Sequence, residues 1–122
     1  MAKVLVIDDE PDVRWLIRMS LERVGHEVLV AEDGLRGVAV AMKQRPEIIV
    51  LDLMMPVMDG YAVMAELAKD PRTAAVPVVV LSARAIPEEA ERATKAGARR
   101  FLEKPFDPDE LVAELDSLLA VS

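Results

Sequence analysis

Three acidic residues stand where apolar segments of the chain end. Asp8 and Asp9 follow the apolar run 4–7, and Asp52 follows the apolar run 48–51. Neighbouring carboxylates repel one another unless a positive group compensates their charge. Carboxylate oxygens are hard ligands, and Mg²⁺ is commonly held by one or two of them together with water and a phosphate oxygen. If these acids meet in the fold, they predict a divalent-cation site.

Two further polar residues follow later apolar runs. Ser82 closes the run VVVLS, and Lys104 follows the segment FLE. A hydroxyl and an ammonium directed to one place suit an anion held beside a metal. Each also has a simpler interpretation, the serine as a local capping residue and the lysine as a solvated surface charge. The acids before Pro11, Glu10 among them, can likewise cap a helix that begins there.

Apolar runs and turn residues predict five strands that alternate with five helices. The expected strands span residues 3–7, 27–31, 47–51, 76–81 and 99–103. The expected helices span residues 11–24, 33–45, 59–69, 87–96 and 108–119. This alternation predicts an α/β fold with a parallel sheet. It is the flavodoxin-like, doubly wound (βα)5 class, a five-stranded parallel sheet of order 2-1-3-4-5 with helices on both faces.

That strand order brings the acids together. In open parallel sheets, ligands bind beyond the carboxyl ends of the strands, where the strand order reverses. The first and third strands are neighbours across that point, so Asp8, Asp9 and Asp52 should converge in one crevice. The sequence contains no internal repeat, low-complexity tract or linker, and we expect residues 1–122 to form a single domain.

Composition excludes several classes of function. The formal net charge of −7 argues against direct nucleic-acid binding, which needs clustered lysine and arginine. The apolar runs are too short to insert in a membrane. The chain has no cysteine, which excludes disulfides and zinc-thiolate sites and fits a cytoplasmic protein.

The chain resembles the receiver domain of bacterial two-component response regulators over essentially its whole length. A pair of adjacent aspartates alone would be weak support. Four pieces match in order and at strand ends, which makes the resemblance highly specific. They are DD at Asp8-Asp9, DLMMPVMDG from Asp52 to Gly60, LSA from Leu81 to Ala83, and KPF from Lys104 to Phe106.

The resemblance implies a phosphorylation site and a metal site. Asp52 would accept a phosphoryl group from a histidine kinase or a histidine phosphotransfer protein. Asp9, Asp52 and the backbone carbonyl of Met54 would bind Mg²⁺ directly, and Asp8 would bind it mostly through water. Mn²⁺ would be able to replace Mg²⁺.

The resemblance also implies a relay. Ser82 and Lys104 would bind phosphoryl oxygens, and Phe101 would be the aromatic switch residue that rotates inward when Ser82 is drawn to the phosphoryl group. The Lys104–Pro105 peptide bond would be cis. Gly60 would follow Asp59 in a turn that accepts an unusual backbone conformation.

The function that follows is a phosphorylation-activated signalling switch, relayed through Ser82 and Phe101 to the face of the last two helices. Its output would be an unknown downstream protein or output domain, and the chain would be a monomer or a weak phosphorylation-dependent dimer. It would not be an enzyme, although it would assist its own phosphotransfer and a slow autodephosphorylation. The alternatives are an aspartate-nucleophile phosphohydrolase and a phosphorylation-independent interaction scaffold. The hydrolase normally has a second acid where this chain has Met54.

Trp15 is the only tryptophan and belongs to the first expected helix. The helical phase buries Val13, Leu16, Ile17 and Leu21 better than Trp15. A partly exposed tryptophan near the acids could contact a helix of the kinase or phosphotransfer partner, because tryptophan often anchors interfaces. A tryptophan that lies on its own helix surface is equally compatible with the pattern.

Overall fold

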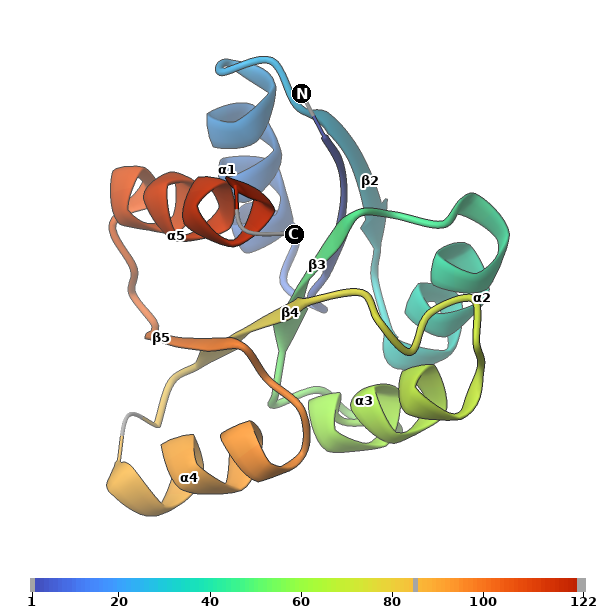
Figure 1. Cartoon of the computed structure of the whole chain (residues 1–122). Coiled ribbons are helices and arrows are strands. Elements are labelled where there is room, and N and C mark those ends of the chain that lie inside the picture. The colour runs from blue at the N-terminus through green and yellow to red at the C-terminus, as the bar shows by residue number, and fades with distance from the viewer. Residues whose placement is uncertain (1, 85, 121–122) are drawn as a thin grey trace.

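The computed structural model describes residues 2–84 and 86–120 and contains a five-stranded sheet with helices on both sides (Figure 1). The strands are β1 (Lys3–Ile7), β2 (Glu27–Ala31), β3 (Ile48–Asp52), β4 (Val78–Ser82) and β5 (Arg100–Glu103). The helices are α1 (Pro11–Glu22), α2 (Gly34–Gln44), α3 (Gly60–Lys69), α4 (Pro87–Lys95) and α5 (Pro108–Ala120). The sheet order is β2-β1-β3-β4-β5 and every pair is parallel. The α/β class and the strand order predicted from the sequence are confirmed.

Two layers of helices cover the sheet. Alternate residues of β1 face opposite sides, so that Leu5 and Ile7 pack with α2, α3 and α4, whereas Val4 and Val6 pack with α1 and α5. Figure 1 shows α1 and α5 together on one side of the strands and the other three helices across the sheet. Because both faces are covered, the three central strands β1, β3 and β4 are almost continuously apolar rather than alternating. Within the described residues, no helix is both long and apolar enough to cross a membrane.

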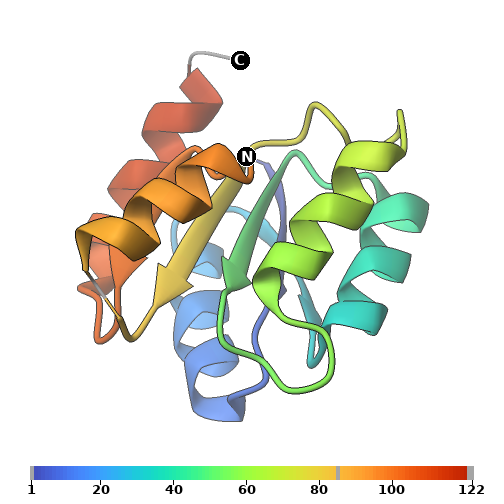
Figure 2. The same ribbon diagram turned by 90° about the horizontal axis from the view of Figure 1, so that it is seen from below.

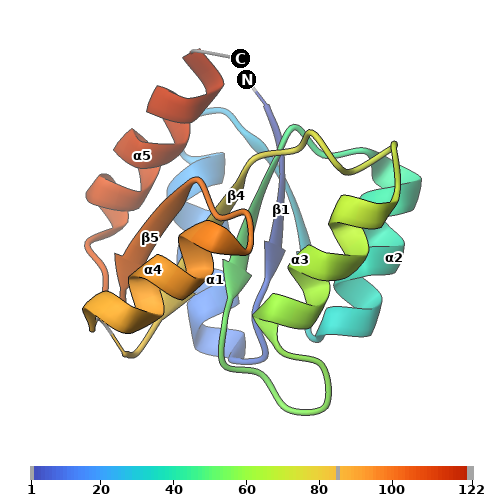
Figure 3. The same ribbon diagram turned by 60° about the horizontal axis from the view of Figure 1, so that its bottom comes forward.

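The sheet brings the polar strand ends to one edge. Figures 2 and 3 show the strand arrowheads directed to the same side of the molecule, where the loop from β3 to α3 lies. Asp52 is the last residue of β3 and Ser82 is the last residue of β4. Asp8 follows β1 directly, and Ile7 is aligned with Leu51 of β3. The register of the strands therefore places Asp8, Asp52 and Ser82 at nearly the same level along the carboxyl edge of the sheet.

Two local expectations are corrected by the structure. Helix α1 ends at Glu22, two residues earlier than predicted, and Gly25 turns the chain toward β2 with a φ of 98°. Gly60 is not among the described residues with positive φ, so an unusual conformation is the wrong reason for it. A Cβ atom at Gly60 would lie 2.8 Å from the Cα atom of Leu53 and 2.9 Å from the carbonyl oxygen of Asp52. Glycine is needed there because α3 begins in close contact with the backbone after β3.

Candidate functional site: an acidic cluster around Lys104

One ammonium group lies among three carboxylates at the carboxyl edge of the sheet. Nζ of Lys104 is 2.9 Å from Oδ2 of Asp8, 2.9 Å from Oε1 of Glu10 and 3.3 Å from Oδ2 of Asp52. The side chains of Asp8 and Asp52 are only 1% and 3% exposed, whereas that of Glu10 is 58% exposed. The backbone N–H of Lys104 donates to the carbonyl oxygen of Ser82 at 2.8 Å, which fixes the lysine beside the end of β4.

Backbone donors orient the two buried carboxylates. Oδ1 of Asp8 accepts a hydrogen bond from the N–H of Glu10 at 2.9 Å, and Oδ1 of Asp52 accepts one from the N–H of Met54 at 3.1 Å. The guanidinium of Arg14 donates to the carbonyl oxygen of Asp8 at 2.8 Å and so braces the turn between β1 and α1. In each carboxylate the second oxygen, Oδ2, is left to face Lys104. Sequence reasoning did not identify the role of Arg14.

The electrostatics of the cluster favour a further positive charge. Burial, followed by the negative charge of Asp8, raises the pKa of Asp52 to about 6. Burial also raises the pKa of Asp8, against the hydrogen bonds from the Glu10 N–H and from Lys104. Burial disfavours the Lys104 ammonium, but its bonds to Glu10 and Asp8 outweigh this and hold the pKa of Lys104 above its ordinary value. The three carboxylates therefore stabilise the positive charge of Lys104. The single ammonium does not fully neutralise the two buried carboxylates, those of Asp8 and Asp52.

The donor set fits a hard divalent cation. Asp8, Asp9, Glu10 and Asp52 each offer a carboxylate oxygen, and these four oxygens all lie within 4.8 Å of one another. Oδ2 of Asp8 is buried, and the ammonium of Lys104 at 2.9 Å is its only ion-pair or hydrogen-bonding partner among the described residues. Clustered carboxylate oxygens of this kind are the ligands that Mg²⁺ prefers. The convergence of the acids expected from the strand order is present.

Ser82, Phe101 and Pro105 belong to the neighbouring strands β4 and β5 and to the turn after β5. Ser82 is fully buried, and its hydroxyl oxygen accepts a hydrogen bond from the N–H of Arg84 at 3.0 Å. Phe101 is half-buried and packs against the apolar cluster on the α2–α3–α4 side of the sheet. The Lys104–Pro105 peptide bond is cis. In the strand register Phe101 is aligned with Val80, two residues before Ser82.

Glu10 has a different role from the one its position suggested. It occupies the N-cap position of α1, but its side chain makes no capping hydrogen bond. Its carboxylate instead binds Lys104, a residue 94 positions away in the sequence. The capping interpretation of Glu10 is therefore wrong. A hint was available, because glutamate is not one of the residues that N-cap positions favour.

The outer face of α1 carries an exposed apolar surface. Trp15 is 62% exposed, Met19 is 50% exposed and Leu16 is 37% exposed. Leu16 is therefore better buried than Trp15, as the helical phase predicted, but it still contributes to the exposed surface. One hollow is lined by Trp15, Leu16, Met19, Ser20, Glu22, Arg23 and Pro108. A second hollow is lined by Glu10, Val13, Leu16, Ala83, Lys104, Pro105 and Phe106. Because Leu16 lines both, the apolar surface continues from Trp15 to the acidic cluster.

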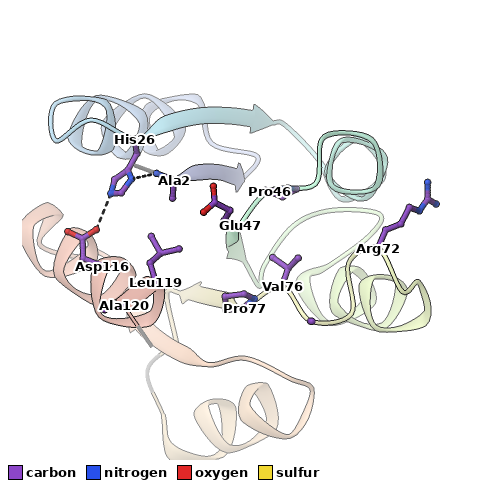
Figure 4. Close-up of a pocket in the computed structure, with 11 residues that line it drawn as sticks. Ala2, His26, Pro46, Glu47, Arg72, Val76, Pro77, Asp116, Leu119 and Ala120 are labelled. Carbon is purple, nitrogen blue, oxygen red and sulfur yellow. Dashed lines mark hydrogen bonds and ion pairs between the residues drawn. The ribbon is translucent and has the colours of Figure 1, made fainter. Parts of the chain in front are cut away.

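A further hollow lies at the opposite edge of the sheet (Figure 4). There, Nδ1 of His26 accepts a hydrogen bond from the N–H of Ala2 at 3.0 Å, and Nε2 of His26 is 3.0 Å from a carboxylate oxygen of Asp116. Both ring nitrogens are thus used to connect the start of β1 with α5. The only histidine of the chain therefore has a structural role and takes no part in the acidic cluster.

Comparison with known proteins identifies the relatives of the chain. The family model described as "Response regulator receiver domain" matches residues 4–116. The chain is 40% identical to the DNA-binding dual master transcriptional regulator RpaA of Synechocystis sp., over 98% of this chain and 49% of RpaA. It is 34% identical to Protein PilH of Pseudomonas aeruginosa, over 98% of this chain and 99% of PilH. The chain therefore spans about half the length of RpaA and almost all of PilH.

Solved structures agree with these sequence relatives. The chemotaxis response regulator CheY4 of Vibrio cholerae superposes with a TM-score of 0.91 at 33% identity, over 96% of this chain and 98% of CheY4. The receiver domain of Francisella response regulator 1452 superposes with a TM-score of 0.90 at 33% identity, over 97% of this chain and 96% of that domain. Receiver domains are signalling domains of two-component systems and not classical enzymes. This chain belongs to the response regulator receiver domain family.

Proposed function

We propose that this chain is a phosphorylation-activated switch in which Asp52 receives the phosphoryl group. The observation that carries the proposal is the position of Asp52: its buried carboxylate lies 3.3 Å from the Lys104 ammonium and beside three further acids that can hold a metal. The family supports the class of function and implies a histidine kinase or histidine phosphotransfer protein as donor. We also propose that residues 1–122 form one receiver domain.

The transfer can be written from the residues present. A carboxylate oxygen of Asp52 attacks the phosphorus of a phosphohistidine, the P–N bond breaks, and the departing imidazole takes up a proton. The product is an acyl phosphate on Asp52. Because phosphoryl transfer depends mainly on positioning and charge neutralisation, Lys104 would pair with a phosphoryl oxygen as the phosphoryl group arrives.

The same proposal assigns the metal ligands. Asp9, Asp52 and the backbone carbonyl of Met54 would hold Mg²⁺, or Mn²⁺ in its place, and Asp8 would contribute mainly through water. Bound there, the cation supplies the positive charge that an anionic phosphodonor needs next to a carboxylate nucleophile. The pKa of Asp52, raised to about 6, leaves most of this carboxylate ionised at neutral pH, as a nucleophile requires.

The proposed relay begins at Ser82. Its hydroxyl accepts a hydrogen bond from the N–H of Arg84 and would turn to a phosphoryl oxygen after transfer. Phe101 would then move inward and alter the face formed by α4, β5 and α5, where Arg100 and Glu114 are paired at 2.8 Å. The phosphoryl group would thereby shift a two-state equilibrium toward a surface with a different affinity for the downstream partner.

Phosphorylation of Asp52 is tested by intact-mass spectrometry after incubation with acetyl phosphate. We expect wild type to gain one phosphoryl group when Mg²⁺ is present and none when it is chelated. Asp52→Asn should gain none under either condition. Released phosphate is assayed in parallel, because turnover without an adduct would instead support the aspartate-nucleophile phosphohydrolase. Neither an adduct nor released phosphate would leave the phosphorylation-independent scaffold as the better description.

Met54 favours the switch over the hydrolase. Its side chain is apolar and 53% exposed at the rim of the site, where a hydrolase would need an acid to protonate the leaving group. It offers no group that could orient an attacking water, so we propose that the acyl phosphate is lost slowly. The spectra described above, followed over time without a phosphatase, give this lifetime directly.

We propose that Trp15 contacts the phosphodonor protein. The exposed apolar surface that includes Trp15 and Leu16 leads to Lys104, so a helix seated on it would bring a phosphohistidine to the edge of the acidic cluster. Large exposed aromatic residues commonly anchor such interfaces.

Trp15→Ala should slow phosphotransfer from a histidine phosphotransfer protein by about tenfold, the effect of losing one interface anchor. Phosphorylation by acetyl phosphate should be unchanged, because this small donor needs no docking surface. Leu35→Ala is the matched control, since Leu35 is also an exposed apolar residue, 68% exposed, but belongs to α2. Equal slowing in both variants, or slowing with acetyl phosphate as well, would contradict a docking role for Trp15.

The output remains a prediction. The downstream protein or output domain, the monomeric or weakly dimeric state, and the cytoplasmic location follow from the family rather than from contacts of this chain. DNA binding is stated for RpaA, of which the chain spans about half. With a net charge of −7, this chain is itself not expected to bind nucleic acid directly.

A further inference from the structure

Glu10 makes a contact that neither helix capping nor the phosphoacceptor site requires. It precedes Pro11 at the start of α1, yet its carboxylate makes no capping bond and lies 2.9 Å from Nζ of Lys104. Of the three carboxylates that contact this ammonium, Glu10 alone is substantially exposed, at 58%. It therefore binds Lys104 from the solvent side, whereas Asp8 and Asp52 bind it from the interior.

The interior contacts of Lys104 conflict with the proposed metal site. The ammonium is 2.9 Å from Oδ2 of Asp8 and 3.3 Å from Oδ2 of Asp52. Both carboxylates belong to the group of acids whose oxygens can gather around one cation. An ammonium and a divalent cation placed on the same oxygens repel each other strongly in a buried site. Lys104 must consequently give up the Asp52 oxygen before that oxygen can bind the cation, and the Asp8 oxygen before it can bind a water of the cation.

We propose that Glu10 is a positioning residue for Lys104, holding the ammonium at the solvent edge while the carboxylates of Asp8 and Asp52 are engaged by a divalent cation. The ammonium then stays charge-paired and remains next to the place where the phosphoryl group arrives. Without Glu10, release of Lys104 from Asp8 and Asp52 leaves it with no carboxylate partner among the described residues. The lysine then competes more strongly for the metal ligands. This inference rests on the proposed metal-dependent function.

The test is the affinity of the protein for Mg²⁺, measured by isothermal titration calorimetry without any phosphodonor. Glu10→Gln removes the charge and keeps the shape, and should raise the Kd for Mg²⁺ about two- to fivefold, the range of an exposed ion pair. Glu10→Asp keeps the charge but withdraws the carboxylate by about 1.5 Å, one carbon–carbon bond. Aspartate is also a favoured N-cap residue, so its carboxylate should turn to the N–H groups of α1. Glu10→Asp should therefore weaken Mg²⁺ binding nearly as much as Glu10→Gln.

A double-mutant cycle with Lys104→Met distinguishes two ways in which Glu10→Gln could weaken Mg²⁺ binding. One acts through the position of Lys104, and the other is the loss of one negative charge near the site. Lys104→Met should itself tighten Mg²⁺ binding, because the competing ammonium is gone. In that background Glu10→Gln should have only the small effect of removing one acid near the site. Asp12→Asn, an exposed acid in the first turn of α1, gives the size of that effect in the wild-type background. Urea unfolding of each variant checks that it is folded.

Two results would overturn the role of Glu10. One is a Glu10→Asp variant that binds Mg²⁺ as tightly as wild type, because charge alone would then suffice. The other is an effect of Glu10→Gln that is undiminished in the Lys104→Met background, because Glu10 would then not act through the lysine. A wild type that binds no Mg²⁺ would instead contradict the metal-dependent function itself, together with this inference.

Discussion

Replacing Asp52 with asparagine should stabilise the metal-free protein at neutral pH by about 2–3 kcal/mol. The reason is that burial and the charge of Asp8 raise the pKa of Asp52 from its ordinary value of 3.8 to about 6 in the folded chain. A difference of about 2 in pKa corresponds to about 3 kcal/mol. At pH 7 the wild-type protein must therefore bury an ionised carboxylate when it folds, which lowers its free energy of unfolding. The asparagine amide is neutral and has nearly the same shape, so it would remove this cost.

The sign of the pH dependence follows from where the proton is held. Between about pH 4 and pH 6 the unfolded chain has lost the proton of Asp52 while the folded chain keeps it. Stability falls with rising pH wherever the folded state binds more protons, so wild type should lose stability across this window. Below pH 4 the carboxyl is protonated in both states, and the difference between wild type and Asp52→Asn should vanish.

The measurement is urea unfolding of wild type and Asp52→Asn from pH 4 to pH 8 with EDTA present to keep the site free of metal. Asp12→Asn serves as the control, because it removes an exposed acid from the first turn of α1 and should show no comparable pH dependence. If Asp52→Asn were no more stable than wild type at pH 7, the carboxylate would be better compensated in the folded protein than its surroundings indicate.

Replacing Lys104 with methionine should have the opposite effect and destabilise the metal-free protein at pH 7 by about 3 kcal/mol. The lysine is the shared counter-charge of Asp8, Glu10 and Asp52, and its side chain is 13% exposed. Removing one partner of a buried ion pair leaves the other charge buried and uncompensated, which costs about 3–5 kcal/mol. The lower end applies because Glu10 remains hydrated and because Asp8 and Asp52 can take up protons.

Two conditions should reduce this loss. Lowering the pH below the raised pKa of Asp52, about 6, neutralises that carboxylate and should recover part of the stability. Adding Mg²⁺ should recover more, since a ligand that binds only the folded state stabilises it. Urea midpoints of Lys104→Met are compared with those of Lys95→Met, which removes a lysine from an exposed pair with Glu91 and should change stability by less than about 0.5 kcal/mol. Equal midpoints for the two variants would contradict the stabilising role of Lys104.

The amino-acid sequence by itself determined the class of fold and the location of the site. Apolar runs that end in Asp8, Asp52 and Ser82 predict strands whose polar ends share one edge, and the structure has this arrangement. These features are readable because strand formation and turn chemistry depend on residues that are near one another in the sequence. The strand order then follows from the few topologies that alternating strands and helices can adopt.

Only the tertiary structure decided which side chains and backbone segments contact one another in and beside the site. From its position before Pro11, Glu10 is a candidate helix cap, but its carboxylate binds Lys104 because the folded sheet brings together residues 94 positions apart. Gly60 is required by the close approach of the backbone after β3, not by its own dihedral angles. Contacts between side chains and backbone from distant segments depend on sheet register and helix placement. An ion pair or a Cβ contact depends on positions accurate to a few tenths of an ångström. The local pattern of the sequence does not determine sheet register or helix placement with that accuracy.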